Sequence, residues 1–451
     1  MRFATLRLQP STPYNERSQL SCLQGVYGAV PISLNDVSRR WDKALLILAA
    51  LIIGGLLWSG CGQTYRPIAN PIPLPGGNPQ ATHFALVVNQ NPPTPGQTAS
   101  PGSVTQIDVS GDTNIANLTA GLNPVHGALN ASLSTGYIVN RGDSTLTGYT
   151  PALGASSSVV TIPLLQNSME PNAGASYVAL SSLYAFVVET SLNRLAVVTN
   201  ALFQVAAFVP VGADPVAVTC TSDGRKAYVA NQGSNTVSVV STKDFTNSKN
   251  IAVGASPEAI TISTDNNYVF VANAGDGTVS VINTTSDTVQ QTVNVGADPT
   301  QVIFDNSLTR VYVLNTGGNS VSIFSASTYP LTLLQTVSTS STPVSLAVLD
   351  NGTKFYVLFQ GTPGSVEVYD AQGFFKRTTV TVGNNTLPTG MPTVNQVLLA
   401  ASPGSTKVYA VNFDGDPVNT SGSTSIIRTL DDTVVLNMPA ALPHPTFVTA
   451  Q

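Results

Sequence analysis

Residues 253–296 read VGASPEAITISTDNNYVFVANAGDGTVSVINTTSDTVQQTVNVG, and neighbouring segments of the chain repeat this pattern. The opening Val-Gly-Ala segment, which ends in proline, recurs on either side at Val211–Pro215 and Val295–Pro299. Asn273 recurs at the same interval as Asn231 and Asn315. Two separate landmarks with one period indicate an array of structural repeats.

The repeat unit contains four short apolar runs that are rich in Val, Ile, Tyr and Thr, as β-strands are. The four runs are Ala259–Ser263, Tyr268–Asn273, Thr278–Ile282 and Thr288–Val293. Gly, Asp and Asn separate the runs, which is the composition of tight turns. A unit of four short strands over about 40–45 residues is typical of one blade of a β-propeller.

The unit resembles the YVTN-type β-propeller repeat of bacterial envelope proteins. The segments that carry the resemblance are Tyr228–Asn231, Phe270–Asn273, Tyr312–Asn315 and Tyr409–Asn412. The segments Thr236–Val239 and Thr278–Val281 follow at the spacing of that family. The resemblance implies a propeller, usually of seven blades, in a superfamily that also includes lactonases. It therefore leaves the activity open.

The landmark at the end of each second strand predicts eight blades. The eight positions are Asn89, Asn140, Glu189, Asn231, Asn273, Asn315, Phe359 and Asn412. The first unit has no inner strand of its own, and the C-terminal segment Pro445–Thr449 matches the inner-strand start Pro299–Ile303. We therefore expect an all-β propeller of four-stranded antiparallel blades over residues 81–451, closed by the C-terminal strand. Seven blades is the alternative.

The first 80 residues differ from the repeats and divide into three segments. Residues 1–36 form an irregular extension, which is either cytoplasmic or untranslated if translation starts at Val37. Residues 37–60 are typical of a secretory signal, because basic residues precede the apolar run Ala44–Trp58. Residues 61–80 form a proline-rich tether.

Small residues lead directly into Cys61, which resembles the bacterial lipobox. This resemblance implies that Cys61 is acylated, so we expect a lipid-anchored protein of the bacterial envelope that faces the periplasm or the cell surface. An uncleaved anchor ending at Trp58 is the alternative. Cys220 then has no disulfide partner in the mature chain and is interpreted as a core residue.

The composition narrows the classes of partner. Only 10% of the residues are charged and the net charge is −5. A nucleic-acid-binding protein should present a basic face, so no nucleic-acid partner is expected. The sequence contains no HExxH, GxSxG, P-loop or paired-cysteine motif. We therefore predict no catalytic residue, no metal site and no cofactor.

Two short motifs are interpreted as turns. Arg141-Gly142-Asp143-Ser144 resembles an adhesion tripeptide, but it occupies the position at which regular units have turn residues. Asp414-Gly415-Asp416 lacks the later glutamate of an EF-hand calcium loop.

A ligand surface is predicted from loop lengths. Alternating strands place the loops between second and third strands on the same face as the loops between blades. Three such loops, 89–103, 382–395 and 412–425, are long and become neighbours when the ring closes. We predict a ligand-binding surface there that contains His126, Asp414, Asp416 and His444. The acids Asp214 and Asp298 near the central channel are the alternative, as is simple variation of loop length.

The predicted function is a monomeric, lipid-anchored binding or protein-interaction module whose ligand is an envelope protein or a carbohydrate. A lactonase-like hydrolase acting at the central channel is one alternative. A structural scaffold of the cell envelope is the other.

Overall fold

The computed structural model describes residues 83–91, 98–130, 132, 134–151, 159–167, 169–384, 397–412, 422–439 and 445–450. The chain divides into two units, Met1–Gly76 and Gly77–Gln451, and every described residue belongs to the second. Cys61, Asp414, Asp416 and His444 lie outside the described residues, as do the central parts of the three long loops. Within the described residues, no helix has both the length and the apolar character needed to span a membrane.

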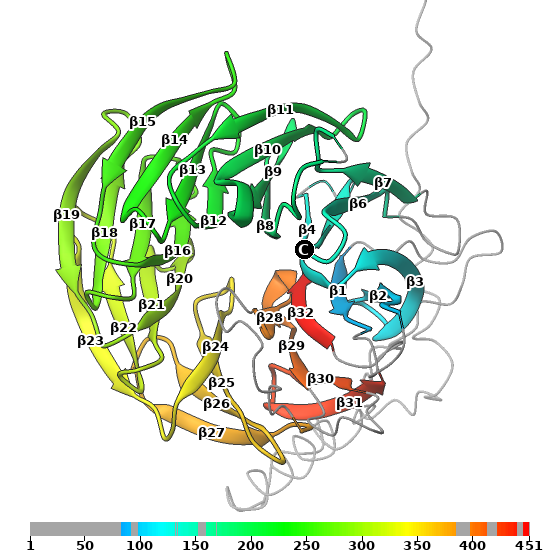
Figure 1. The fold of residues 1–451 in the computed structure, drawn as a ribbon. Helices are drawn as coiled ribbons and strands as arrows, with labels where there is room; N and C mark the ends of the chain where they lie inside the picture. The colour runs from blue at the N-terminus through cyan, green and yellow to red at the C-terminus, as the bar shows by residue number, and fades with distance from the viewer. Residues whose placement is uncertain are drawn as a thin grey trace, which may run out of the picture. The chain divides into compact units, whose positions relative to one another are not determined.

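Eight four-stranded antiparallel sheets are arranged as blades around one axis (Figure 1). The strands of the first four blades, from the axis outward, are β32 (Pro445–Ala450), β1 (Phe84–Asn89), β2 (Pro101–Asp108) and β3 (Thr113–Leu122) in blade 1; β4 (Pro124–Leu129), β5 (Gly136–Asn140), β6 (Thr145–Tyr149) and β7 (Val159–Pro163) in blade 2; β8 (Ala175–Leu180), β9 (Tyr184–Glu189), β10 (Arg194–Thr199) and β11 (Gln204–Pro210) in blade 3; and β12 (Pro215–Cys220), β13 (Lys226–Asn231), β14 (Thr236–Ser241) and β15 (Thr246–Ala252) in blade 4.

The strands of the other four blades, in the same order, are β16 (Pro257–Ile262), β17 (Tyr268–Asn273), β18 (Thr278–Asn283) and β19 (Thr288–Asn294) in blade 5; β20 (Pro299–Asp305), β21 (Arg310–Asn315), β22 (Ser320–Ser325) and β23 (Thr332–Ser338) in blade 6; β24 (Pro343–Val348), β25 (Lys354–Phe359), β26 (Ser365–Asp370) and β27 (Lys376–Thr381) in blade 7; and β28 (Leu399–Ala401), β29 (Lys407–Asn412), β30 (Ser423–Arg428) and β31 (Thr433–Pro439) in blade 8. Two short 3₁₀ turns, η1 (Thr190–Leu192) and η2 (Pro403–Ser405), complete the described elements.

The C-terminal strand closes the ring. Strand β32 pairs antiparallel with β1, with Val87 opposite Val448 and Leu86 opposite Thr449. The first blade is therefore built from both ends of the propeller, and the prediction of eight blades and of this closure is confirmed. Seven blades, the alternative, is wrong.

The predicted strands match the observed ones closely in the repeat unit. Strand β17 has the predicted bounds, whereas β16 begins at Pro257, two residues earlier than predicted. Pro257 lies opposite Asn273, and the register shifts between Pro257 and Ala259. Proline is tolerated there because it is the first residue of the strand.

The landmark asparagines fasten the second strand of a blade to the third. Asn273 is completely buried, and its amide nitrogen donates to the hydroxyls of Thr278 and Ser280, each at 3.0 Å. The same arrangement recurs at the other regular landmarks, Asn89, Asn140, Asn231, Asn315 and Asn412. The asparagine thus joins the second and third strands across their turn.

A second recurring contact joins successive blades on the face of the ring opposite to the landmark asparagines. The Lys354 ammonium donates to Asp432 at 2.7 Å and to the carbonyl of Thr429, and the Tyr356 hydroxyl donates to the same carboxylate. We call this arrangement the interblade clasp. Lys226 with Asp287 and Lys407 with Asp112 repeat it, and the latter joins blade 8 to blade 1.

The core lies between the blades. Both faces of the second and third strands are buried, and Val271, Val279 and Val281 are all inaccessible. Cys220 is buried at the end of β12 and is a free thiol, as expected for a core residue.

Candidate functional site

The turns between second and third strands meet the loops between blades on one face of the ring, which we call the junction face. The amide of Gln232 donates to the carbonyl of Asp214 at 2.9 Å, and that of Ala274 donates to the carbonyl of Ser256. Antiparallel pairing, as in blade 4, places the described loops of these two classes on this face, as predicted. The turns that contain the interblade clasps lie on the opposite face.

Polar side chains form pairs where the inner strands begin at the junction face. Ser176 and Thr190 share a hydrogen bond of 3.0 Å, and Thr300 and Thr316 share one of 2.6 Å. Thr190 also donates to the carbonyl of Pro215 at 2.8 Å, which connects blade 3 to blade 4. Ser176 lies on the inner strand β8 and Thr300 on the inner strand β20, and these strands line one side of the axis together with β12 and β16 (Figure 1).

Glu258, the second residue of β16, adds a carboxyl group to these polar pairs. Its carboxylate accepts a hydrogen bond from the Gln232 amide of blade 4 at 3.1 Å. Burial, reinforced by the negative charge of Asp298, raises the pKa of Glu258 to about 7, although the hydrogen bond from Gln232 opposes the shift. The carboxyl is therefore divided between its neutral and ionised forms near neutral pH.

These seven residues, which we call the axial polar cluster, span blades 3 to 6: Ser176, Thr190, Gln232, Glu258, Asp298, Thr300 and Thr316. All are half-buried except Asp298, which is exposed. Together they present hydroxyl groups, an amide and two carboxyl groups at the axial end of the junction face. This set can donate and accept hydrogen bonds to a polar ligand.

The two acids predicted near the axis occupy equivalent turns. Asp214 and Asp298 each precede the proline that begins an inner strand, with φ of 48° and 52°. Aspartate tolerates this left-handed region better than most residues. Both side chains are exposed, but only Asp298 influences Glu258.

His126 is located inside the packing between inner strands. Its side chain is only 4% exposed, and its ring lies 3.9 Å from that of Tyr177 and 4.2 Å from that of Phe447. The Val178 amide donates to Nδ1 at 3.4 Å. Burial lowers the pKa of His126 to about 3, so the imidazole is neutral at physiological pH. In this position His126 packs blades 1, 2 and 3 together and does not present a ring edge to a ligand surface.

The Arg-Gly-Asp motif is integrated into a turn. The Asp143 carboxylate accepts the Leu122 amide at 2.9 Å and the Thr145 hydroxyl at 2.8 Å. Asp276 accepts the Ala255 amide in the equivalent turn of blade 5. The acidic residue is therefore used within the fold at both positions.

The sequence interpretation missed Glu258 and Gln232. The second residue of the inner strand is Val, Ser or Thr in the other blades where the equivalent position is described: Val125, Ser176, Val216, Thr300, Val344 and Thr446. The glutamate at this position in blade 5 is the feature of the sequence that could have identified the site. Its significance depends on Gln232, which comes from a different blade and which periodicity alone does not connect to it.

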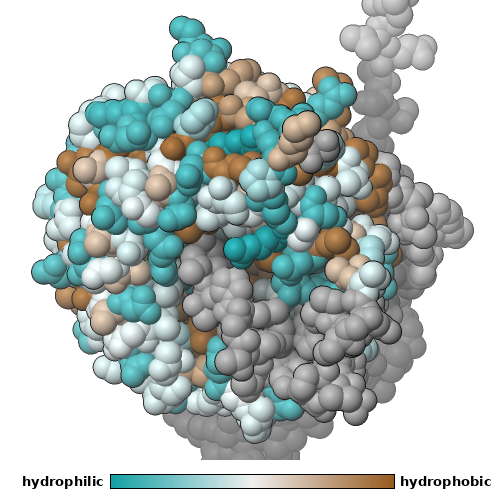
Figure 2. Space-filling view, in the orientation of Figure 1, coloured by the Kyte–Doolittle hydropathy of each residue, from teal (hydrophilic) through white to brown (hydrophobic). Residues whose placement is uncertain are grey.

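Among the described residues, no three or more His, Cys, Asp or Glu side chains converge as a metal site would require. Figure 2 shows hydrophilic and hydrophobic residues interspersed over one face of the ring, with hydrophilic residues near its centre.

The profile of the YNCE-like beta-propeller family matches residues 188–429, which is more than half of the chain. The chain belongs to the YNCE-like beta-propeller family. No curated protein sequence matches this YNCE-like propeller significantly.

Several solved structures share the fold of this YNCE-like propeller. Apo AztD from Citrobacter koseri is 11% identical, with a TM-score of 0.59 over 83% of this chain and 98% of that one. The dihydro-heme d1 dehydrogenase NirN in complex with DHE is 12% identical, with a TM-score of 0.60 over 84% of this chain and 78% of that one. A putative 6-phosphogluconolactonase from Bacteroides uniformis is 13% identical, with a TM-score of 0.52 over 82% and 99%. At these identities the likeness shows the fold alone.

Proposed function

We propose that this YNCE-like propeller is a lipid-anchored binding module of the bacterial envelope that holds its ligand at the axial polar cluster. The ligand is an envelope protein or a carbohydrate. The observation that carries the proposal is the contact between Gln232 and Glu258, with Asp298 nearby. A rigid ring brings together polar groups from several blades there, and their hydrogen-bonding capacity is only partly used within the fold.

The ring provides a pre-organised scaffold for such a site. Glu258 and Thr300 lie on inner strands that pair with the second strands of their blades. Their backbone positions are therefore fixed before a ligand binds. Pre-organisation of this kind reduces the entropy lost on binding. The loops between blades supply the remaining contacts, as is common for sites built on rigid scaffolds.

Ligand capture from an envelope extract tests the binding proposal. The full-length protein in detergent would serve as bait in three forms: wild type, Glu258→Arg and the control Asp223→Arg. Asp223 is an exposed acid in a turn on the opposite face, so the same charge reversal is made away from the cluster. We expect Glu258→Arg to reduce the captured ligand at least about tenfold and the control to retain it. Equal capture by all three folded forms would show that the ligand binds at another part of the protein.

The lipid anchor has a separate test. Because small residues lead into Cys61, we expect Cys61→Ala to release the protein from the membrane fraction and to remove the mass of the acyl chains. A variant that fractionates like the wild type and has an unchanged mass would show that Cys61 is not acylated.

A hydrolase of lactonase type is the second candidate, and one observation favours it. A carboxyl group with a pKa of about 7 can act as a general base at neutral pH. Turnover of a panel of sugar lactones, abolished by Glu258→Gln and retained by Asp223→Asn, would support hydrolysis over simple binding.

A further inference from the structure

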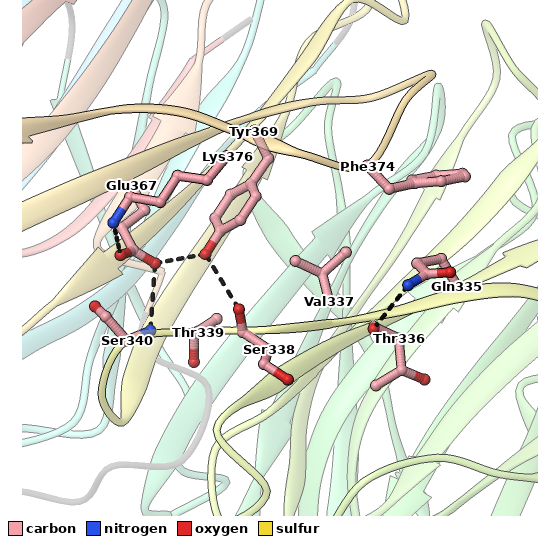
Figure 3. Close-up of a pocket in the computed structure, with 10 residues that line it drawn as sticks. All are labelled: Gln335, Thr336, Val337, Ser338, Thr339, Ser340, Glu367, Tyr369, Phe374 and Lys376. Carbon is pink, nitrogen blue, oxygen red and sulfur yellow. Dashed lines mark hydrogen bonds and ion pairs between the residues drawn. The ribbon is translucent and has the colours of Figure 1, made fainter.

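A polar pocket of about 500 Å³ lies at the outer rim of the ring between blades 6 and 7 (Figure 3). One wall is the outermost strand of blade 6, β23, with the residues that follow it, and the other comes from β26 and the turn into β27. The lining residues are Gln335, Thr336, Val337, Ser338, Thr339, Ser340, Glu367, Tyr369, Phe374 and Lys376. We call this the rim pocket, and it is separate from the axial polar cluster on the inner strands.

The main chain of blade 6 forms one wall of the rim pocket. Successive side chains of a strand point to opposite faces, so a pocket on one face would contact alternate residues. Here six consecutive residues, from Gln335 to Ser340, line the pocket. The pocket therefore runs along the edge of β23, where no strand of the described residues pairs with it.

Hydrogen bonds show which peptide groups face the pocket. The Thr339 amide donates to the Asn319 carbonyl at 2.9 Å, so it points towards β22 and away from the pocket. The alternate residues face the other way: the Ser338 carbonyl accepts from the Tyr369 hydroxyl, and the Ser340 amide donates to Glu367, both at 3.5 Å. By the same alternation, the peptide groups of Thr336 and Ser338 point into the rim pocket.

The accessible charge in the rim pocket is positive. The side chain of Lys376 is 44% exposed, whereas that of its ion-pair partner Glu367 is only 1% exposed. Glu367 also accepts from the Tyr369 hydroxyl at 2.5 Å. Burial opposes ionisation of Glu367, but these contacts outweigh it and keep the pKa of the carboxyl below its ordinary value. An incoming molecule therefore meets the ammonium group and not the carboxylate.

The rim pocket arises where the repeat departs from its pattern. Glu367 stands at the position that Ser238, Ser280 and Ser322 occupy in regular blades, and Phe359 replaces the landmark asparagine. The longer Glu367 side chain reaches blade 6 and, with Tyr369 and Lys376, forms a polar wall opposite β23 (Figure 3).

We propose that the rim pocket binds an extended peptide segment that carries an acidic side chain. The segment adds to the edge of β23 through main-chain hydrogen bonds with Thr336 and Ser338, as peptides do when they extend a sheet. Its acidic side chain pairs with Lys376, and an adjacent side chain lies against Phe374. The pocket volume is within the range of about 300–1,000 Å³ that is typical of ligand sites.

A defined peptide library tests this assignment on the full-length protein. The probes are fluorescently labelled, acetylated and amidated hexapeptide pools in which one position is fixed as Asp or as Asn, and binding is measured by fluorescence anisotropy. We expect at least one Asp pool to bind about tenfold more tightly than its Asn counterpart. We expect Thr336→Pro, which removes an outward-facing amide donor, to weaken that binding at least about tenfold. Thr292→Pro at the equivalent exposed position of β19 is the matched control and should leave binding unchanged.

N-methylated versions of the best peptide separate strand addition from other modes of binding. Each amide of the peptide would be methylated in turn. Binding should be lost only when the methyl group is on every second residue, because only the amides of those residues face β23. The assignment is overturned if no pool binds more tightly than about 1 mM, or if Thr336→Pro and Thr292→Pro behave alike. It is also overturned if disaccharides displace the peptide while methylation has no effect, or if gel filtration shows a dimer that Thr336→Pro dissociates, which would make a second copy the occupant.

Discussion

At the scale of single residues, buried polar groups hold each blade together. The landmark asparagines are the recurring example, because each one directs its amide nitrogen at two hydroxyls of the third strand. Blades 3 and 7 lack the landmark asparagine and have charged groups in place of this contact. In blade 3, Glu189 at the landmark pairs with Arg194, which also bonds Glu170 at 3.0 Å and the Leu164 carbonyl at 2.8 Å.

We expect Asn273→Ala to destabilise the propeller by about 1–3 kcal/mol, because it leaves the buried hydroxyl of Ser280 without its donor. Denaturant unfolding measures the effect. Asn294→Ala, at an exposed position at the end of β19, serves as the control and should stay within about 0.5 kcal/mol of wild type. Similar losses in both variants would contradict the structural role of the landmark.

His126 predicts a dependence of stability on pH. Its pKa in the folded protein, about 3, is below the ordinary value of 6.5, so the unfolded chain takes up the proton first. Its contribution to stability is complete above pH 6.5 and is lost as the pH falls towards 3, at up to about 1.4 kcal/mol per pH unit. His126→Phe should flatten this part of the stability curve between pH 7 and pH 5. An unchanged slope in the variant would place the acid sensitivity in other groups.

At the scale of elements, the interblade clasps connect one blade to the next. The Lys354–Asp432 pair is almost completely buried, with side-chain exposures of 9% and 8%, whereas the neighbouring Arg428–Asp431 pair is 50% and 40% exposed. A buried charge that loses its partner is costly, whereas an exposed ion pair contributes little.

We therefore expect Asp432→Asn to destabilise the protein by about 3–5 kcal/mol, since it leaves the Lys354 ammonium buried without its counter-charge. Asparagine also tolerates the positive φ of 57° at this position, so backbone strain is not added. The adjacent Asp431→Asn should cost much less, because its ion pair with Arg428 is exposed to solvent. Thermal unfolding of the two variants compares them directly, and equal shifts would refute the difference in burial as the cause.

At the scale of the whole molecule, the ring depends on its last strand. Val448 in β32 is inaccessible, whereas Thr449 beside it is half-buried. Val448→Asp places an unpaired carboxylate in the closing blade and should cost several kcal/mol. Thr449→Asp should cost clearly less. If both variants melt like the wild type, β32 does not hold the ring closed.

The sequence predicts the fold because each blade repeats local signals. The landmark asparagine, the proline that begins an inner strand and the turn residues all lie within one unit, so their spacing alone yields strands, blades and closure. The axial polar cluster could not be predicted in the same way. Gln232, Glu258 and Asp298 belong to three different blades, and they meet only because the ring bends their turns towards one axis.

The environments of other residues also depend on this assembly. His126 reads as a candidate ligand in the sequence, but the inner strands of blades 1 and 3 enclose it between Phe447 and Tyr177. The rim pocket similarly depends on Glu367 of blade 7 reaching Ser340 beside blade 6. Contacts of this kind between blades carry no periodic signal.

Site-specific photocrosslinking in intact cells tests most directly whether the junction face binds the ligand. p-Benzoylphenylalanine would replace Ala297 on the junction face in one strain and Lys243 on the opposite face in another, both at exposed positions outside the strands. The proposed function predicts a crosslinked partner from position 297 that disappears when Glu258→Arg is added, and none from position 243. A crosslink that arises only from position 243, or one from position 297 that survives Glu258→Arg, would contradict it.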